Sequence, residues 1–136
     1  MADCIFCRIV AGEVEAFKVY EDDDSLAFLD INPAAPGHTL VVTKVHAENI
    51  FDIDEIDLRR LVGAVKHVAA KIRAAIGSDI MVVQNNGSTA GQVVDHIHFH
   101  IIPRTEGDGI GLARGRVELS REQLQELAEK IKTASV

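Results

Sequence analysis

The chain has 136 residues, of which 47% are hydrophobic and 26% charged, and its formal net charge at pH 7 is −7. This length and composition are typical of one globular domain and not of a disordered chain. The acidic charge argues against a protein that follows a nucleic-acid backbone, although a single phosphate ligand needs only a few local donors. We expect no membrane span and no signal peptide. Two cysteines are too few for a disulfide scaffold, so we expect a cytoplasmic protein.

The N-terminal half of the chain predicts a short helix followed by three strands. Residues 4–11 (CIFCRIVA) fit a helical turn that ends at Gly12. Acidic residues 21–24 predict a hairpin turn between two of the strands, and two prolines and a glycine in 32–38 predict a loop before the third. The three strand-like runs, rich in β-branched and aromatic residues, are 17–20 (FKVY), 25–30 (SLAFLD) and 38–44 (HTLVVTK).

The central part of the chain predicts one long helix and two more strands. Apolar residues recur at spacings of three and four through 54–76, and Gly77 follows in the usual position of a C-terminal cap. Strand-like runs follow at 80–86 and at 96–102, with a polar loop between them, and Pro103 is expected to end the second.

The remaining residues predict a surface connection and a terminal helix. Residues 107–115 are rich in glycine and indicate a surface connection. Ser120 and Gln123 match a capping box, so we expect a helix over 121–133. Because three strand-like runs precede the long helix with no helix between them, the chain predicts an α+β fold with about five antiparallel strands.

Three of the six histidines alternate in the last strand-like run, as His96, His98 and His100. Alternate side chains of a strand share one face, with Cα atoms about 6.6–6.8 Å apart, so the three imidazoles are expected to line one face. Three interpretations stay open: a solvated strand face, a zinc site, or nucleophilic catalysis on phosphorus. The polar loop 85–92 favours phosphorus chemistry, because its backbone N–H groups can form an anion-binding concavity.

The chain resembles the histidine triad superfamily, because residues 96–102 (HIHFHII) fit its pattern of histidines alternating with apolar residues. The nearest branch is that of the small histidine-triad nucleotide-binding proteins. The resemblance covers 4–105 and implies a single domain over 1–136, in which 106–136 form a C-terminal tail and helix. It implies a HIT-like fold with a five-stranded antiparallel sheet, one long helix and a C-terminal helix. Further segments in the order and spacing of that family are IFCRIV (5–10), LAFLDINP (26–33), PGH (36–38) and GQ (91–92).

The resemblance implies a hydrolase of nucleoside phosphoramidates or related purine nucleotide conjugates. In that pattern His98 attacks the α-phosphorus and forms a nucleotidylated histidine, which water then hydrolyses. His100 contacts the phosphate and assists the leaving group, and His38 lies beside His98 and helps to move its proton. A dinucleoside polyphosphate hydrolase and a nucleotide-binding scaffold with incidental hydrolysis are the alternatives. The residues implied to bind substrate are Ile5, Phe6, Ile9, Asp30, Ile31, Asn85, Gly91, Gln92 and Val93.

Members of this set are assigned to different parts of the substrate. Asp30 is implied to accept hydrogen bonds from ribose hydroxyls, the amide and glycine residues to hold the phosphate, and the apolar residues to sandwich the base. Phe28 is assigned to the hydrophobic core instead.

Two positions depart from the family pattern. Val93 stands where a serine or threonine commonly contacts the leaving group, and Asp95 stands where an apolar or aromatic residue is common.

Cys4 and Cys7 form a C-x-x-C motif. A redox motif of this kind opens a helix after a strand in a thioredoxin-like context, which is absent here, and a zinc site needs two further ligands. The resemblance supplies them as His46 and His96, and so implies a closed structural zinc site and no catalytic metal. Two interpretations remain beside it: two partly buried thiols with His46 at the surface, or a zinc-dependent enzyme whose ligands are the three alternating histidines.

The family forms homodimers by joining sheets edge to edge, and pairing removes the liability of an exposed edge strand. The expected partners are therefore a purine nucleotide or nucleotide conjugate and a second copy of the chain, with no nucleic acid and no membrane. His67, in the middle of the long helix, matches no motif and is expected at the surface or between helices.

Overall fold

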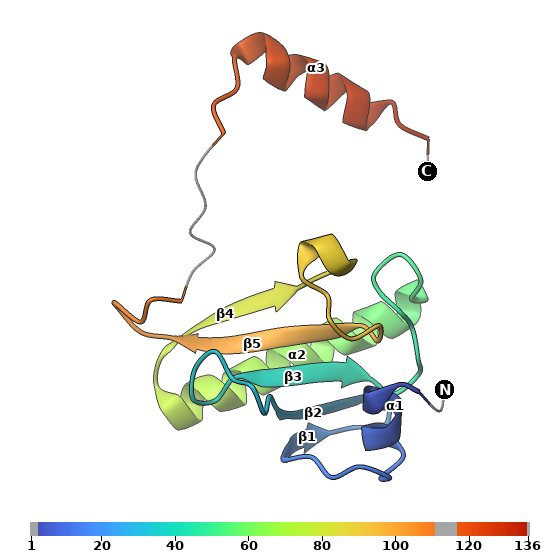
Figure 1. Cartoon of the computed structure of the whole chain (residues 1–136), viewed down its shortest axis with the longest axis vertical. Coiled ribbons are helices and arrows are strands. Elements are labelled where there is room, and N and C mark those ends of the chain that lie inside the picture. Colours follow the sequence, from blue (N-terminus) through green and yellow to red (C-terminus); the bar gives the residue numbers. More distant parts are fainter. Residues whose placement is uncertain (1–2, 111–116, 136) are drawn as a thin grey trace.

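A computed structural model describes residues 3–110 and 117–135 (Figure 1). Five strands form one antiparallel sheet in the order β1-β2-β3-β5-β4, which confirms the predicted α+β architecture. The elements in chain order are α1 (Ile5–Val10), β1 (Lys18–Glu21), β2 (Ser25–Leu29), β3 (Thr39–Thr43), α2 (Glu55–Ile76), β4 (Asp79–Gln84), the short 3-10 helix η1 (Ser88–Ala90), β5 (His98–Arg104) and α3 (Arg121–Lys132).

Helix α2 covers one face of the sheet, and both of its ends are capped, the C-terminal end by Gly77 as predicted. Asp54 accepts a hydrogen bond of 2.9 Å from the Ile56 N–H at the first turn. Gly77 follows the last turn with φ 78°, a left-handed conformation that glycine adopts without a Cβ clash. The apolar stripe of α2 packs against β2, β3 and β5 and is buried there. The buried residues of this core are Ala27, Val41, Ala47, Leu61, Ala64, Val65, Val68, Ile72, Ile97 and Ile101.

Helix α1 lies on the opposite face, because neighbouring residues of a strand point to opposite sides of a sheet. Phe28 of β2 packs with Phe6 and Ile9 of α1, whereas the adjacent Ala27 belongs to the core beneath α2. Figure 1 shows α1 in front of the strands and α2 behind them. The sheet is therefore the middle layer of three, and the assignment of Phe28 to the core is confirmed.

Strand β5 carries two of the alternating histidines to the face that α1 covers. His98 pairs with Val42 of β3 and His100 pairs with Leu40, and both of these β3 residues belong to the core beneath α1. The regular strand begins at His98, so His96 precedes it instead of opening it as predicted. The reason is a tertiary contact, since the neighbouring Ile97 N–H donates to the Ala47 carbonyl in the loop after β3, at 2.8 Å.

Pro103 does not end this strand, contrary to prediction. Strand β3 pairs with β5 only as far as Ile101, so Pro103 faces no β3 carbonyl that would need a donor. On the other side β4 still pairs with β5, with Ile80 opposite Pro103 and Asp79 opposite Arg104. A proline is tolerated where one side of a strand lacks a partner, and the strand runs on to Arg104.

The predicted tail is described in part. The capping box of Ser120 and Gln123 is present, and α3 ends one residue before the predicted boundary. None of its residues is buried. The predicted surface connection over 107–115 includes 111–115, which lie outside the described residues. In the part of the chain that the structure describes, every helix is too short or too polar to cross a membrane.

Candidate active site and metal cluster

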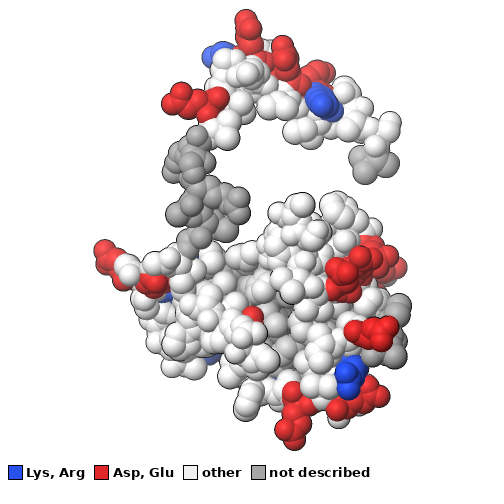
Figure 2. Space-filling model, in the orientation of Figure 1, with Lys and Arg blue, Asp and Glu red and all other residues white. Residues whose placement is uncertain are grey.

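A cavity of about 490 Å³ opens on the α1 face of the sheet, with His98 and His100 in its wall. Its size is that of an ordinary small-molecule site. Figure 2 shows this face as largely uncharged in the middle and bordered by acidic side chains. Six of the nine residues predicted to bind substrate line the cavity, namely Ile5, Phe6, Ile9, Asp30, Ile31 and Val93.

The tautomer of His98 follows from its backbone contact. Nδ1 of His98 lies 2.7 Å from the carbonyl oxygen of His96. A carbonyl oxygen only accepts, so Nδ1 carries the proton and Nε2 keeps a free lone pair. The ring of Phe6 packs edge-on against this imidazole, with centroids 5.1 Å apart. His98 is thus a neutral imidazole whose nucleophilic atom is Nε2.

A chain of hydrogen bonds fixes His100 in the complementary state. The Ala34 N–H donates to Nδ1 of His38 at 2.9 Å, so the proton of His38 sits on Nε2. That Nε2 lies 3.0 Å from Nδ1 of His100 and 3.5 Å from a carboxylate oxygen of Asp30. Nδ1 of His100 therefore accepts, and Nε2 of His100 is the atom that holds a proton. The structure places His38 beside His100, whereas the sequence predicted it beside His98.

Burial keeps these imidazoles neutral. It lowers the pKa of His100 to about 4, helped by the nearby His98 and His38, and it lowers the pKa of His98 and of His38 below the ordinary value of 6.5. Asp30 opposes the shift in all three cases. At pH 7 the pair therefore offers one bare nitrogen on His98 and one N–H donor on His100.

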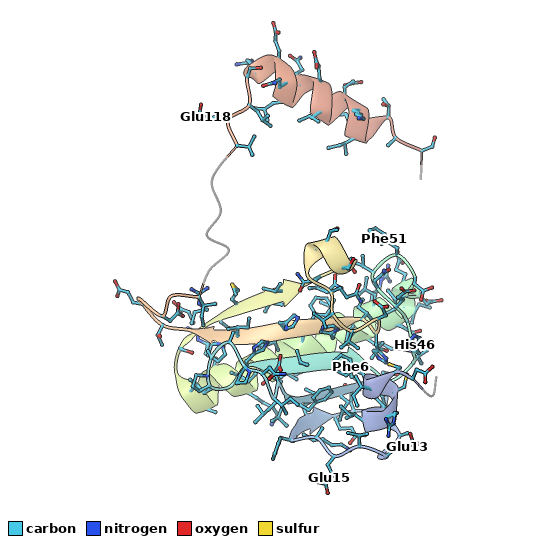
Figure 3. All side chains as sticks on the ribbon, viewed as in Figure 1. Phe6, Glu13, Glu15, His46, Phe51 and Glu118 are labelled. Carbon is cyan, nitrogen blue, oxygen red and sulfur yellow. The ribbon has the colours of Figure 1, made fainter. Side chains whose placement is uncertain are left out.

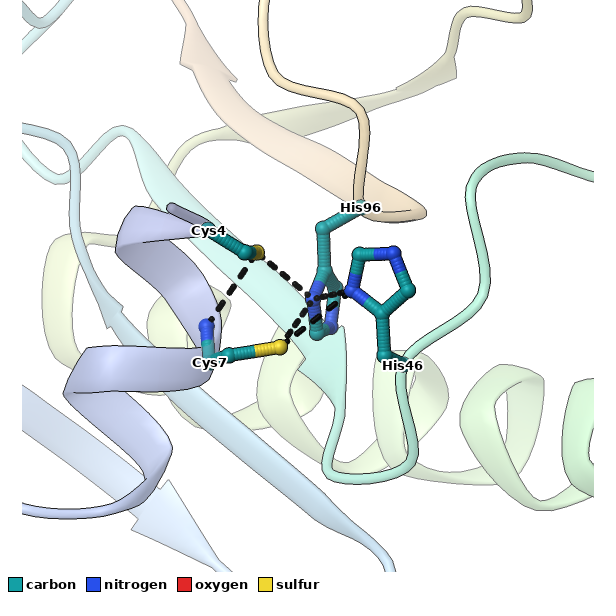
Figure 4. A group of neighbouring side chains, drawn as sticks. All are labelled: Cys4, Cys7, His46 and His96. Atoms are coloured by element: carbon teal, nitrogen blue, oxygen red, sulfur yellow. Dashed lines mark hydrogen bonds between the residues drawn. The ribbon is translucent and has the colours of Figure 1, made fainter. Parts of the chain in front are cut away.

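A second group of side chains lies where α1 meets the loop after β3 and the entrance to β5 (Figure 4). Cys4 caps α1, because its sulfur accepts from the Cys7 N–H at 3.3 Å. His46 lies at this end of the sheet, as does Phe6 of α1 (Figure 3). The ligand atoms of Cys4, Cys7, His46 and His96 all lie within 4.8 Å of one another. The four residues predicted as zinc ligands are therefore brought together.

The spacing of these atoms fits a tetrahedral ion. Zn²⁺ with Zn–S near 2.3 Å and Zn–N near 2.0 Å separates sulfur from nitrogen by about 3.5 Å and nitrogen from nitrogen by about 3.3 Å. The sulfur of Cys7 lies 3.2 Å from Nδ1 of His46 and 3.5 Å from Nδ1 of His96, and the two Nδ1 atoms are 3.2 Å apart. Nε2 of His96 donates to the Thr43 carbonyl at 2.7 Å, so its Nδ1 lone pair faces the cluster.

The three alternating histidines do not form a metal site of their own among the described residues. His96 belongs to the cysteine cluster, whereas His100 groups with Asp30 and His38. This second group is a poor metal site as well. Nδ1 of His38 accepts the Ala34 N–H, which leaves a protonated Nε2 facing the other two residues.

Three residues predicted to hold the phosphate lie outside the wall of the cavity and brace its loops instead. Asn85 donates to the Ala90 carbonyl at 2.6 Å. Gly91 has φ 94°, and a Cβ there would meet the Asn85 amide at 3.4 Å. Gln92 is 5% exposed, and its side-chain amide accepts the Gly87 N–H and donates to the carbonyls of Glu48 and Val94. These residues shape the site by holding backbone in place.

The two departures from the family pattern have different surroundings. Val93 is 91% exposed and lines the cavity, so an apolar group stands at its rim. Asp95 is exposed and lines a second cavity of about 510 Å³ with Asp3, Cys4 and His46. Sequence reasoning missed several residues in the wall of the first cavity, among them Phe17 and Val94. Phe17 sits before a strand and Val94 in a loop, where no periodicity marks a cavity wall.

A five-stranded antiparallel sheet that presents alternating histidines to a ligand-sized cavity defines the class of histidine triad folds. The profile of the HIT domain matches residues 11–107, and the chain belongs to the HIT family. The HIT-family protein of Bacillus subtilis has the same fold, with a TM-score of 0.89 and 40% identity over 98% of this chain and 99% of that one.

Two relatives carry the names of activities. The chain is 42% identical over 130 residues to an adenosine 5′-monophosphoramidase of Schizosaccharomyces pombe, covering 94% of this chain and 95% of that protein. It is 38% identical over 128 residues to an adenylylsulfatase of Arabidopsis thaliana, covering 90% of this chain and 65% of that protein.

Proposed function

We propose that this protein hydrolyses nucleotide conjugates at the α-phosphate, with nucleoside phosphoramidates as the first substrate class. The observation that carries the proposal is the bare Nε2 of His98, next to an N–H donor on His100, in the wall of an apolar cavity. The relatives named as a monophosphoramidase and an adenylylsulfatase support the same reaction class.

The proposed reaction is a double displacement. Nε2 of His98 forms a bond to the α-phosphorus while the bond from phosphorus to the leaving nitrogen breaks. The Nε2–H of His100 donates a hydrogen bond to that nitrogen, which takes a proton from solvent water and leaves as an amine, while the Nε2–H of His38 keeps Nδ1 of His100 an acceptor. The His96 carbonyl stabilises the charge that develops on His98. Water then attacks phosphorus and loses a proton to solvent while the bond from phosphorus to Nε2 of His98 breaks, which releases a nucleoside monophosphate and free His98.

The cavity offers matching groups to the rest of the substrate. Ile5, Ile9 and Ile31 supply apolar surface for a purine ring. One oxygen of Asp30 accepts the Asn32 N–H at 2.8 Å, and the other, which lies 3.5 Å from Nε2 of His38, keeps lone pairs for ribose hydroxyls.

Release of AMP from adenosine 5′-phosphoramidate tests the proposal. The wild type is expected to turn over, and His98→Ala is expected to lose turnover while keeping its fold by circular dichroism. The matched control is His67→Ala, because His67 is an exposed histidine of α2 outside both clusters. Equal turnover by wild type and His98→Ala would remove His98 as the nucleophile.

A dinucleoside polyphosphate is the second candidate substrate, because the exposed Val93 offers no hydroxyl to a departing amine. Product analysis separates the two classes, since a polyphosphate yields two nucleotides and a phosphoramidate yields one. Tight nucleotide binding with negligible turnover on both would favour a binding scaffold.

We propose a structural Zn²⁺ at Cys4, Cys7, His46 and His96, on the basis of the donor set and its spacing. A bound ion links α1 to β5 and supplies no chemistry at phosphorus. Mass spectrometry of the purified protein should find one zinc per chain, and Cys4→Ser should lose it. Two free thiols in a metal-binding arrangement also suit the reducing cytoplasm, where we place the protein.

We further propose a homodimer. Strands β1 and β4 are the edges of the sheet, and β4 is the longer, with Val82 47% exposed. Pairing at such an edge satisfies open backbone groups and covers apolar surface. Sedimentation at micromolar concentration should show a dimer, and a monomer alone would contradict it.

A further inference from the structure

The metal cluster and the predicted nucleophile are joined through one residue, His96. Its Nδ1 lies 3.3 Å from the sulfur of Cys4, and its Nε2 donates to the Thr43 carbonyl of β3 at 2.7 Å. Its backbone carbonyl accepts the Nδ1 proton of His98, also at 2.7 Å. The carbonyl that accepts this hydrogen bond, and so determines the tautomer of His98, belongs to His96, whose side chain is part of the cluster.

Phe6 makes a second connection between the two sites. It lies between the two cysteines on α1, and its ring packs edge-on against His98 at 5.1 Å, His96 at 5.8 Å and Phe28 at 5.5 Å between centroids. Helix α1 has six residues, which is too short to be stable without tertiary support. The cysteines at the start of α1 are thus well placed to hold the Phe6 ring against the imidazole of His98.

The cluster also borders the wall of the substrate cavity. Ile5, Val93 and Val94 line both the cavity that contains His98 and the second cavity beside Cys4 and His46. One thin apolar wall therefore separates the two, and the cluster is reached from solvent through the second cavity. A change at the cluster has a short path to the substrate cavity.

We propose that metal binding at this cluster positions the catalytic histidine. With the ion bound, the His96 carbonyl and the Phe6 ring hold His98 in one tautomer and orientation, with Nε2 directed at the cavity. Without it, α1 and the segment before β5 lose their link, and His98 gains rotational and tautomeric freedom. This inference rests on the proposed function, and Phe6 is a positioning residue in it. Small displacements of a catalytic group are costly, so kcat is the parameter most affected.

The test uses wild-type protein stripped by a chelator and then reloaded with Zn²⁺ alone. Nitrogen-15 NMR of the imidazoles reports the tautomer of His98, and adenosine 5′-phosphoramidate turnover reports kcat and KM. Stripping is expected to replace the single Nδ1–H signature of His98 by a tautomer mixture and to lower kcat about 10–100-fold, the usual range for lost outer-shell partners. Reloading is expected to restore both. An unchanged His98 signature in the stripped, folded protein would overturn the inference.

Phe6→Leu separates positioning from metal loss, because all four ligands remain. It is expected to bind one Zn²⁺ per chain as the wild type does, with a lower kcat and a disturbed His98 signature. His46→Gln removes a ligand that does not contact the catalytic pair, and His67→Gln is the matched histidine control. A wild-type kcat and NMR signature in zinc-loaded Phe6→Leu would refute the role of Phe6. The NMR result stands without turnover, so failure of the proposed hydrolase activity is recognised separately.

Discussion

Truncation of Gln92 to alanine should destabilise the protein far more than its loop position suggests. The Gln92 side chain accepts the Gly87 N–H at 2.8 Å and donates to the carbonyls of Glu48 at 2.7 Å and Val94 at 3.0 Å. It thereby joins the loop before β5 to the loop after β3. Each of these bonds contributes about 1 kcal/mol net, and Gln92→Ala leaves one donor and two acceptors without a partner. We expect a loss of about 3 kcal/mol in the free energy of unfolding.

The assay is urea unfolding followed by circular dichroism, supported by a thermal scan. For a domain of this size the loss corresponds to a fall in Tm of about 6–12 °C. The matched control is Gln125→Ala on the exposed face of α3, which should change stability by less than about 0.5 kcal/mol. A Gln92→Ala protein within that same margin of wild type would show that the buried amide does not join the two loops.

Three further changes test other parts of the structure. Leu61→Ala, in the fully buried core beneath α2, should cost about 2–5 kcal/mol by urea unfolding. Gly37→Ala should cost about 1–3 kcal/mol by thermal unfolding, because φ is 93° and a Cβ would overlap Ile76 Cδ1. Lowering the pH from 7 to 5 should reduce the free energy of unfolding measured in urea. The pKa of His100 and of His98 is lowered in the folded protein, so below pH 6.5 these imidazoles take up protons in the unfolded chain more readily than in the folded one. Protonation therefore favours the unfolded chain. For the same reason the acid limb of kcat/KM should have its midpoint below pH 6.5.

Each of these has its own control. Val62→Ala removes a half-exposed neighbour of Leu61 on the same helix and should be nearly neutral. Gly77→Ala carries the same backbone strain as Gly37→Ala, but a Cβ there meets no atom within 4 Å, so its loss should be smaller. Equal losses would remove the steric argument. An acid limb of kcat/KM above pH 6.5 would contradict the lowered pKa of His98.

Local patterns in the sequence predicted most of the fold. The two-residue period of the histidine run placed His98 and His100 on one face, and the structure has both on the face of α1. Apolar periodicity and the Gly77 cap predicted α2 to within one residue at its start. These predictions depend only on neighbours in the chain, because side-chain direction and helix ends are determined by local backbone geometry.

The errors fall where distant segments meet. His96 leaves the strand because the Ala47 carbonyl, in the loop after β3, takes the N–H of Ile97. Gln92 was predicted to hold phosphate, but its donors are taken by Glu48 and Val94. A motif shows which side chains are present and leaves open which backbone groups lie beside them.

The sequence by itself predicted the α+β architecture and the shared face of the alternating histidines, and its family resemblance supplied the four potential zinc ligands. Only the tertiary structure decided which nitrogen of each histidine carries a proton. The carbonyls of His96 and Thr43 and the N–H of Ala34 set that choice. The partner of His96 lies 53 residues away, at Thr43. An imidazole has two chemically similar nitrogens, and the backbone groups that the fold brings to each ring distinguish the proposed nucleophile from the proposed donor and the proposed metal ligand.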